Sequence, residues 1–286
     1  AMVSGKSRII GLVVAYLDNH FYPEALEKLS NALQKRGYHV LVFMASKTAG
    51  DINDVVEEIL DYQVDGIITA SVAMSSELSD RCRKAGVPIV LFNRSQDGPG
   101  ISSVASANVA GGRKIAEFLL AGDHKKIAYI AGWEGASTQR DRELGFTTRL
   151  QEAGMSLHAR GVGNFQMDQA AEAVRDMMAS DPPDAIFVAN DHMAFAVMDV
   201  LRHELGLAVP GDVSVVGYDD VPTAAWPAYG LTTLRQPANR MVAETVDLLL
   251  AEIDGQSLGP RKVEIEGPLV VRSSARIPEG WTHEGI

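Results

Sequence analysis

Polar side chains in this chain come directly after short apolar runs. Asn190 and Asp191 follow Ala185–Ala189, and Asp219 follows Val213–Gly217. Buried parallel strands have this pattern when side chains at their carboxyl ends meet a ligand. Carboxylates and amides exchange paired hydrogen bonds with neighbouring hydroxyl groups, and arginine adds a fixed fork of donors. The pattern therefore predicts a binding site for a small, polyhydroxylated ligand.

The same position after other apolar runs holds further polar residues. They are Asn19, Asn93, Arg94, Arg140 and Arg142. The asparagines and aspartates have a plainer interpretation as helix caps or turn formers. Their common place at the ligand-binding edge of an α/β sheet favours a shared site. Flat apolar faces for a sugar ring are offered by Phe21, Tyr22, Phe165 and Trp226. Aromatic residues of this kind more often belong to the core, so both interpretations stay open.

The residues that carry enzymatic chemistry are not arranged in any recognisable motif. Asp219 and Asp220 are adjacent, and neighbours in an extended segment point to opposite faces, so they are not expected to face one substrate together. The sequence has no GxSxG nucleophile elbow, and its seven histidines lack the spacing of metal ligands. The single cysteine, Cys82, excludes an internal disulfide and a cysteine-based zinc cluster. We therefore expect a binding protein, not an enzyme, without a cofactor or metal ion.

Strand-like runs alternate with helical patterns over almost the whole chain, which predicts α/β architecture with parallel sheets covered on both faces. Strands are expected at 8–15, 40–44, 66–69, 88–92, 127–131, near 161, and at 185–189, 213–217, 231–234 and 263–271, the last interrupted by Gly267-Pro268. Helices are expected from Pro23 to Gly37 and at 52–62, 76–85, 109–120, 138–153, 168–179, 193–205 and 239–253. The alternation breaks at Gly98–Ala107, a Gly-Pro-Gly and Ser/Ala-rich stretch. We therefore predict two Rossmann-like lobes with a boundary near residue 106.

Composition restricts the classes of partner. The 286 residues carry a formal net charge of −11, and the basic residues are scattered, so this polypeptide alone is expected to bind DNA poorly. No apolar run approaches the ~20 residues needed to span a bilayer, and the first residues lack the pattern of a secretory signal. Together with the single cysteine, these features favour a cytoplasmic protein without a membrane partner.

Several long phrases closely resemble the effector-binding domain of the LacI/GalR family of bacterial transcriptional regulators. They include IIGLVVAYLDNHFYPEALEKL, VPIVLFNR, NVAGGRKIAEFLLAGDHKKIAYIAG, ANDHMAFAVMDVLRHELGLAVPGDVSVVGYDD and LTTLRQP. The resemblance covers roughly residues 1–277. It implies the fold of periplasmic sugar-binding proteins, with two lobes joined by crossovers near 106, 236 and 263. The implied organisation is a hinge remnant (1–7), an N-terminal lobe (8–106 plus 237–262), a C-terminal lobe (107–236 plus 263–277) and a tail (278–286).

The resemblance also implies which residues contact a ligand, commonly a sugar, in the cleft between the lobes. They are Asn19, Phe21, Tyr22, Asn93, Arg94, Arg142, Phe165, Asn190, Asp219 and Gln236. Arg142 matches the family's effector-binding arginine, and Phe165 matches an aromatic that stacks on the ring. Gln236 and the aromatics are favoured by the resemblance. Asn93 stands where sugar binders often have Asp, which removes a charge from the expected cleft.

For function, the resemblance implies a homodimeric core that senses a small carbohydrate-like effector and changes operator affinity. It also implies that the family's helix-turn-helix domain is absent here, so operator DNA would be a partner of the full-length protein alone. The alternative is a solute-binding protein of a sugar ABC transporter, which would share the fold but carry an export signal and be monomeric. A sugar isomerase or hydrolase is disfavoured, because the catalytic motifs are missing.

Overall fold

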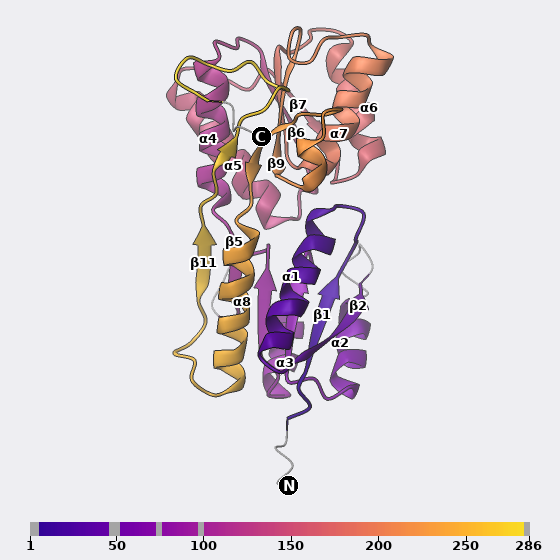
Figure 1. Ribbon diagram of the computed structural model, residues 1–286, viewed down its shortest axis with the longest axis vertical. Coiled ribbons are helices and arrows are strands. Elements are labelled where there is room, and N and C mark those ends of the chain that lie inside the picture. Colours follow the sequence, from indigo (N-terminus) through magenta and orange to yellow (C-terminus); the bar gives the residue numbers. More distant parts are fainter. Residues whose placement is uncertain (1–5, 46–51, 73–75, 97–99, 283–286) are drawn as a thin grey trace. The chain divides into compact units, whose positions relative to one another are not determined.

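The computed structural model describes residues 6–45, 52–72, 76–96 and 100–282, which form two compact α/β units (Figure 1). Unit 1 comprises Ala1–Ser106 and Pro237–Ile265, and unit 2 comprises Ala107–Gln236 and Glu266–Ile286. Each unit contains a six-stranded sheet in which strands and helices alternate along the chain. The prediction of two parallel-dominated sheets flanked by helices is confirmed.

The sheet of unit 1 has the order β11-β5-β4-β3-β1-β2, and all its pairs are parallel. Its strands are β1 (Ile9–Val14), β2 (His39–Met44), β3 (Gly66–Ala70), β4 (Ile89–Phe92), β5 (Ser102–Ser106) and β11 (Lys262–Ile265). Its helices are α1 (Phe21–Lys35), α2 (Ile52–Asp61), α3 (Ser76–Lys84) and α8 (Ala238–Ile253). Strands β1, β3 and β4 are predominantly apolar, as expected for strands with helices on both faces of the sheet.

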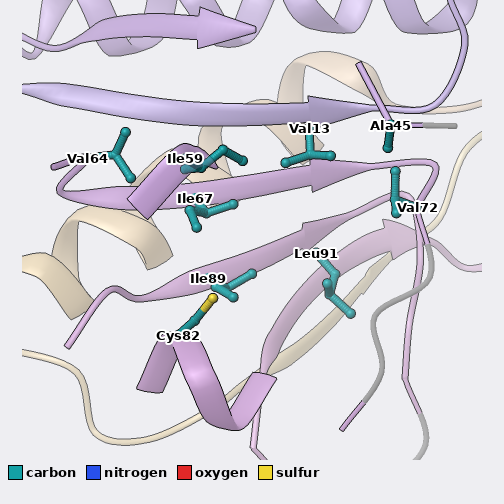
Figure 2. Close-up of a cluster of buried hydrophobic side chains, with 9 residues drawn as sticks. All are labelled: Val13, Ala45, Ile59, Val64, Ile67, Val72, Cys82, Ile89 and Leu91. Atoms are coloured by element: carbon teal, nitrogen blue, oxygen red, sulfur yellow. The ribbon is translucent and has the colours of Figure 1, made fainter. Parts of the chain in front are cut away.

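The alternation of side chains along β3 shows which helices cover which face of this sheet. A Cβ at Gly66 would lie 2.9 Å from Leu249 of α8, so this residue faces α8. The next residue, Ile67, belongs to a buried cluster with Ile59 of α2 and Cys82 of α3 (Figure 2). Successive strand residues point to opposite faces. Helix α8, which packs on α1, therefore covers one face, and α2 and α3 cover the other.

The sheet of unit 2 has the order β12-β10-β9-β8-β6-β7, with only β12 antiparallel to its neighbour. Its strands are β6 (Ile127–Ala131), β7 (Ala159–Val162), β8 (Ala185–Val188), β9 (Ser214–Asp219), β10 (Thr232–Arg235) and β12 (Leu269–Val270). Its helices are α4 (Asn108–Ala121), α5 (Ser137–Glu152), α6 (Met167–Met178) and α7 (Asp191–Asp199), with a π-helix (Val200–Glu204) and a 3₁₀ turn (Pro222–Ala225).

Helices α4 and α5 pack with their backbones in contact. A Cβ at Gly112 would lie 2.1 Å from the Arg142 carbonyl oxygen, and one at Gly145 would lie 2.0 Å from that of Val109. No side chain larger than hydrogen fits at either position. This close crossing brings the first two turns of α4 against the segment Arg142–Gly145 of α5.

The structure corrects one sequence prediction and gives the bounds of two others. The break expected at Gly98–Ala107 contains strand β5, whose five residues are all buried; positions 98 and 99 lie outside the described residues. The buried Ser102 hydroxyl donates to Glu252 and accepts the Arg261 N–H. Because its polar group is hydrogen-bonded, this serine-rich segment can be an inner strand. The crossover expected near 263 falls in β11, which pairs with β5 and extends unit 1 to Ile265. The strand-like run 263–271, which Gly267-Pro268 interrupts, forms the two strands β11 and β12.

The two terminal segments make contacts with the units. Of the expected hinge remnant, residues 1–5 lie outside the described part, while the Ser7 N–H donates to Asp65 at 2.9 Å. Within the expected tail, the Trp281 ring packs edge-on against Phe118 of α4, with centroids 5.2 Å apart. Trp281, within the expected tail, is therefore packed on unit 2. In the described segments, no helix combines the length and apolarity required to cross a membrane.

Candidate functional site

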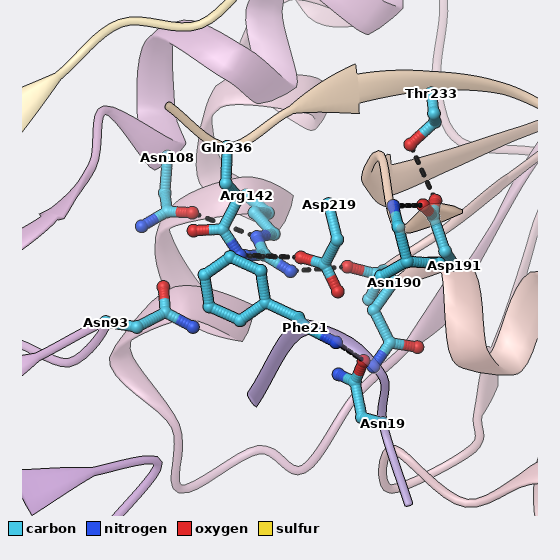
Figure 3. Close-up of polar contacts among 12 residues, drawn as sticks. Asn19, Phe21, Asn93, Asn108, Arg142, Asn190, Asp191, Asp219, Thr233 and Gln236 are labelled. Carbon is cyan, nitrogen blue, oxygen red and sulfur yellow. Dashed lines mark hydrogen bonds and ion pairs between the residues drawn. The ribbon is translucent and has the colours of Figure 1, made fainter. Parts of the chain in front are cut away.

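Arg142, on the second turn of α5, is the centre of a buried polar cluster in unit 2 (Figure 3). Its Nε donates to Asn108 Oδ1 at 2.9 Å, and its Nη1 donates to the Ala189 carbonyl at 2.6 Å. The guanidinium carbon lies 3.7 Å from the centroid of the Tyr218 ring, which supports it from one face. Nη2 lies 3.7 Å from Asp219 Oδ1. Three elements of the unit, α4, the end of β8 and β9, thus hold the fork of donors in one orientation.

Asp219, the last residue of β9, supplies the negative charge beside Arg142. Its φ of 132° turns the chain sharply at the end of the strand. Gln236 follows β10 and donates from Nε2 to Asp219 Oδ1 at 2.6 Å. The other amide atom, Gln236 Oε1, is buried without a hydrogen-bond partner among the described residues. An unpaired buried acceptor costs about 1–3 kcal/mol, so a donor from a ligand would stabilise this group.

Asn190 and Asp191 are adjacent, but they have different surroundings. Asn190 is the N-cap of α7, because its Oδ1 accepts the Met193 N–H at 3.0 Å. Asp191 is completely buried and accepts from Thr233 Oγ1 at 2.6 Å and from the Val221 N–H at 3.0 Å. Burial, together with the neighbouring charge of Asp219, raises the pKa of Asp191 well above its ordinary value. The contacts of Asp191 therefore connect α7, β10 and the segment after β9, which is a structural role.

The aromatic side chain expected to stack on a ligand is held by a glycine. A Cβ at Gly132, after β6, would lie 2.1 Å from the Phe165 ring, so the ring rests directly on the glycine backbone. Phe165 itself has φ of 60° and Asn164 has φ of 52°, the left-handed region that side chains disfavour. Strain of this kind is found at functional sites when the surrounding structure compensates for it.

Two further sequence candidates lie away from this cluster. Arg140 is exposed and pairs with Asp141 at 2.8 Å, although it precedes Arg142 by two residues. A step of two residues along a helix is a rotation of about 200°, so Arg140 points to the opposite side of α5. Trp226 is 57% exposed. Neither residue joins the Arg142 cluster.

The predicted residues of unit 1 form a second buried group after β1 and β4. Asn19 Oδ1 accepts the Phe21 N–H at 3.1 Å (Figure 3), and Asn93 Nδ2 donates to Tyr22 Oη at 3.1 Å. Arg94 donates from Nη1 to the Asn93 carbonyl at 2.9 Å. Asn93 Oδ1 is buried without a hydrogen-bond partner in the described chain, as is Gln236 Oε1. The Phe21 ring stacks on Phe92, with centroids 6.2 Å apart.

All ten residues expected at the site are buried, and within each unit the structure connects most of them through hydrogen bonds or ion pairs. The cluster of unit 2 combines one cation, one carboxylate and several amide groups. This set can both donate hydrogen bonds to a ligand's hydroxyl groups and accept hydrogen bonds from them. Among the described residues, no group of three or more His, Cys, Asp or Glu is placed to hold a metal ion.

The sequence interpretation did not include Asn108 and Tyr218 in the site. Asn108 begins α4 directly after β5, and it follows a strand end like the other candidates. The sequence does not show that Asn108 follows a strand, because the Ser/Ala composition of β5 predicts a loop. Tyr218 is an inward residue of β9 and is completely buried, so nothing in a strand pattern distinguishes it from a core residue.

Comparisons with known proteins identify relatives that share this fold. A family model described as a periplasmic binding protein-like domain matches residues 115–275. The HTH-type transcriptional repressor PurR of Photobacterium profundum is 27% identical over 274 residues, which cover 94% of this chain and 82% of that protein. A transcriptional regulator CelR–cellobiose complex is 30% identical with a TM-score of 0.85, over 94% of this chain and 85% of that chain. A lac repressor dimer bound to operator and the anti-inducer ONPF is 26% identical with a TM-score of 0.85, over 95% of each chain.

Proposed function

Since the chain belongs to the LacI/GalR family of transcriptional regulators and comprises its effector-binding domain, we propose that it senses a sugar or a related small polar effector. In this proposal the effector contacts Arg142, Phe165, Asn190, Asp219 and Gln236 of unit 2, together with Asn19, Phe21, Tyr22, Asn93 and Arg94 of unit 1. The effector is bound without being chemically converted, and the protein acts in the cytoplasm as a homodimer. Effector binding changes the affinity for operator DNA through a helix-turn-helix domain.

The observation that carries the proposal is the buried Arg142–Asp219–Gln236 cluster. Its members come from α5, from the end of β9 and from the segment after β10, so three separate elements converge at the carboxyl edge of one sheet. Ligands bind at this edge in open α/β folds. The unpaired Gln236 Oε1 offers an acceptor to a ligand's hydroxyl groups, and the Nη N–H groups of the preorganised guanidinium that do not bond Ala189 offer donors.

The related CelR structure supports a carbohydrate as the ligand, because that regulator is complexed with cellobiose. Regulation requires that the effector bind one arrangement of the protein better than another. A ligand with equal affinity for both arrangements would leave operator binding unchanged, however tightly it bound. We therefore propose that the effector binds the two arrangements of the protein with different affinities.

The test is a calorimetric and thermal-shift screen against sugars, sugar acids, polyols, phosphosugars and nucleobases. We expect a hydroxyl-rich compound to bind the wild type and to lose affinity for Asp219→Ala, while the exposed Asp176→Ala on α6 retains it. Sedimentation at several concentrations tests the dimer. A compound that binds wild type and Asp219→Ala equally would show that the effector site is elsewhere, and product formation would exclude a pure binding function.

A further inference from the structure

A second cavity lies in unit 1, at the amino edge of its sheet. It has a volume of about 400 Å³. Its walls come from α3, from the loops before β4 and β5, from the last turn of α8 and from the segment before β11. The proposed effector contacts of this unit follow the carboxyl ends of β1 and β4, so they lie at the opposite edge of the same sheet. The cavity is therefore distinct from the effector site.

Glu252 is the charged group that distinguishes this cavity. Its side chain is half-buried, and Oε1 accepts the Ser102 hydroxyl at 2.6 Å. Ser102 is almost completely buried, and its oxygen also accepts the Arg261 N–H at 3.2 Å, which fixes its hydroxyl toward Glu252. Within the described segments Ser102 is the sole polar partner of the Glu252 carboxylate, and no cation pairs with it. Burial raises the pKa of Glu252 despite this hydrogen bond.

The position of Glu252 in its helix adds a second, independent reason to expect a cation. Glu252 lies in the last turn of α8, and that turn has no basic residue. The carboxyl end of a helix carries a partial negative charge that cations stabilise and carboxylates oppose. Asp254, just beyond the helix, is paired with Lys6, and Arg83 in the cavity wall is paired with Asp80. The carboxylate and the helix end thus leave one negative charge without compensation in the described residues.

The rest of the cavity wall is apolar and leaves space for a short alkyl chain. Val87, Pro88, Ile89 and Ile101 provide apolar surface, and Gly86, Gly100 and Gly259 leave space where side chains would fill it. Cys82 lies at the inner wall, where its sulfur is directed toward Ile89 (Figure 2). A carboxylate with an apolar wall around it complements a compound with a charged nitrogen and a hydrocarbon stem.

We propose that this cavity binds a small organic cation, an alkyl ammonium or guanidinium compound, with Glu252 as its counter-ion and Ser102 holding the carboxylate in place. The ligand nitrogen donates to the carboxylate in a charge-assisted hydrogen bond, and its stem lies along Val87 and Ile101. Because the site is separate from the Arg142 cluster, the regulator would have a second chemical input.

The experiment uses 1,4-diaminobutane and agmatine as probes, with neutral 1,4-butanediol as the matched control. Titrations are run at 0.15 M salt, where screening over about 8 Å suppresses non-specific attraction to a protein of net charge −11. Cysteine labelled with ¹³C at Cβ gives one resonance, because Cys82 is the single cysteine, and that resonance reports on the cavity wall. Calorimetry measures the affinity in parallel.

We expect a saturable shift of the Cys82 resonance with at least one amine and no shift with the diol. Glu252→Gln should weaken binding at least about tenfold, as expected for the loss of a hydrogen bond to a charged group. Glu244→Gln, two turns earlier on α8, is the matched control and should retain wild-type affinity. No saturable shift, equal binding of the diol, or equal affinity in the Glu252→Gln variant would overturn the proposal.

Discussion

The guanidinium carbon of Arg142 lies 3.7 Å from the centroid of the Tyr218 ring, and this contact sets the plane of the arginine fork. Tyr218 is completely buried in β9, and its own position depends on α4, because a Cβ at Gly111 would lie 2.5 Å from the Tyr218 hydroxyl. Asn108 and the Ala189 carbonyl then fix the fork within that plane. The arginine is therefore oriented before any ligand arrives, which reduces the entropy lost on binding.

Replacing Arg142 by lysine should abolish effector-dependent stabilisation, although the charge is kept. An ammonium group cannot reproduce the planar fork or its stacking on Tyr218, so Asp219 would lose its oriented partner. Arg142→Ala should also lower the free energy of unfolding, by about 3–5 kcal/mol if Asp219 stays buried and charged. Thermal shifts with and without the effector measure both effects. Arg140→Lys, two residues earlier and exposed, should behave as wild type; a loss of binding there would contradict the assigned geometry.

Replacing Asp191 by asparagine should remove a pH dependence of stability. The pKa of Asp191 is raised in the folded protein, first by burial and then by Asp219, above its value in the unfolded chain. Between these two values the folded state keeps a proton that the unfolded state has lost, so wild-type stability falls as pH rises. Asparagine keeps one acceptor oxygen for the Val221 N–H, its amide N–H can donate to the Thr233 hydroxyl oxygen, and it does not titrate.

Urea unfolding at pH 5 and pH 8.5 checks this prediction. The stability of Asp191→Asn relative to wild type should increase between the two pH values. The exposed Asp176→Asn serves as the control and should show no such increase. A relative stability of Asp191→Asn that does not change with pH would contradict the raised pKa.

His124 should make the protein less stable in mild acid. The ring is buried against Asp184, Arg276 and Asp123, and burial is the main cause that lowers the pKa of His124 below its ordinary value. The pKa of histidine in the unfolded chain is about 6.5. As pH falls through this value, the unfolded chain binds a proton that the folded protein does not bind, so the free energy of unfolding decreases. The advantage of wild type over His124→Leu, measured by urea unfolding, should be smaller at pH 5.5 than at pH 7.5. An advantage that grows in acid would show that Asp184 stabilises the charged ring instead.

Gly132→Ala should weaken effector binding through Phe165. The added methyl group would lie 2.1 Å from the Phe165 ring and must displace it from the position where it would stack on a ligand. Phe165→Ala should weaken binding as well, by removing the ring. Because both substitutions act on one ring, their effects should not add in the double variant. Calorimetry on the four proteins tests this, and additive losses would indicate two separate mechanisms.

The strand-end rule recovered most of the polar cluster but could not separate its members from their neighbours. It selected Arg142 together with Arg140, and Asn190 together with Asp191. Within each pair the two residues have different surroundings, because Arg140 points to solvent and Asp191 connects three elements inside unit 2. Side-chain direction depends on helix rotation and on what packs against the element, which a linear pattern does not contain.

Strand β5 is an element that the sequence pattern did not predict. Its residues Ser102–Ser106 have the composition of a loop, because serine and alanine carry little of the apolar signal that marks a strand. The segment is an inner strand because β4 and β11 pair with its two edges and Glu252 satisfies the Ser102 hydroxyl. Since β11 lies about 160 residues further along the chain, no local window could have identified the pairing.

The amino-acid sequence alone therefore determined the order of the strands and helices apart from β5, the parallel architecture and the positions of most polar residues at strand ends. These are properties of local periodicity, which neighbouring residues carry. The tertiary structure decided which of those residues share hydrogen bonds, which buried atoms stay unpaired and where a second cavity forms. Such relationships depend on distant elements packed at ångström separations, as at Gly112 against Arg142, and distances of that kind have no linear signature.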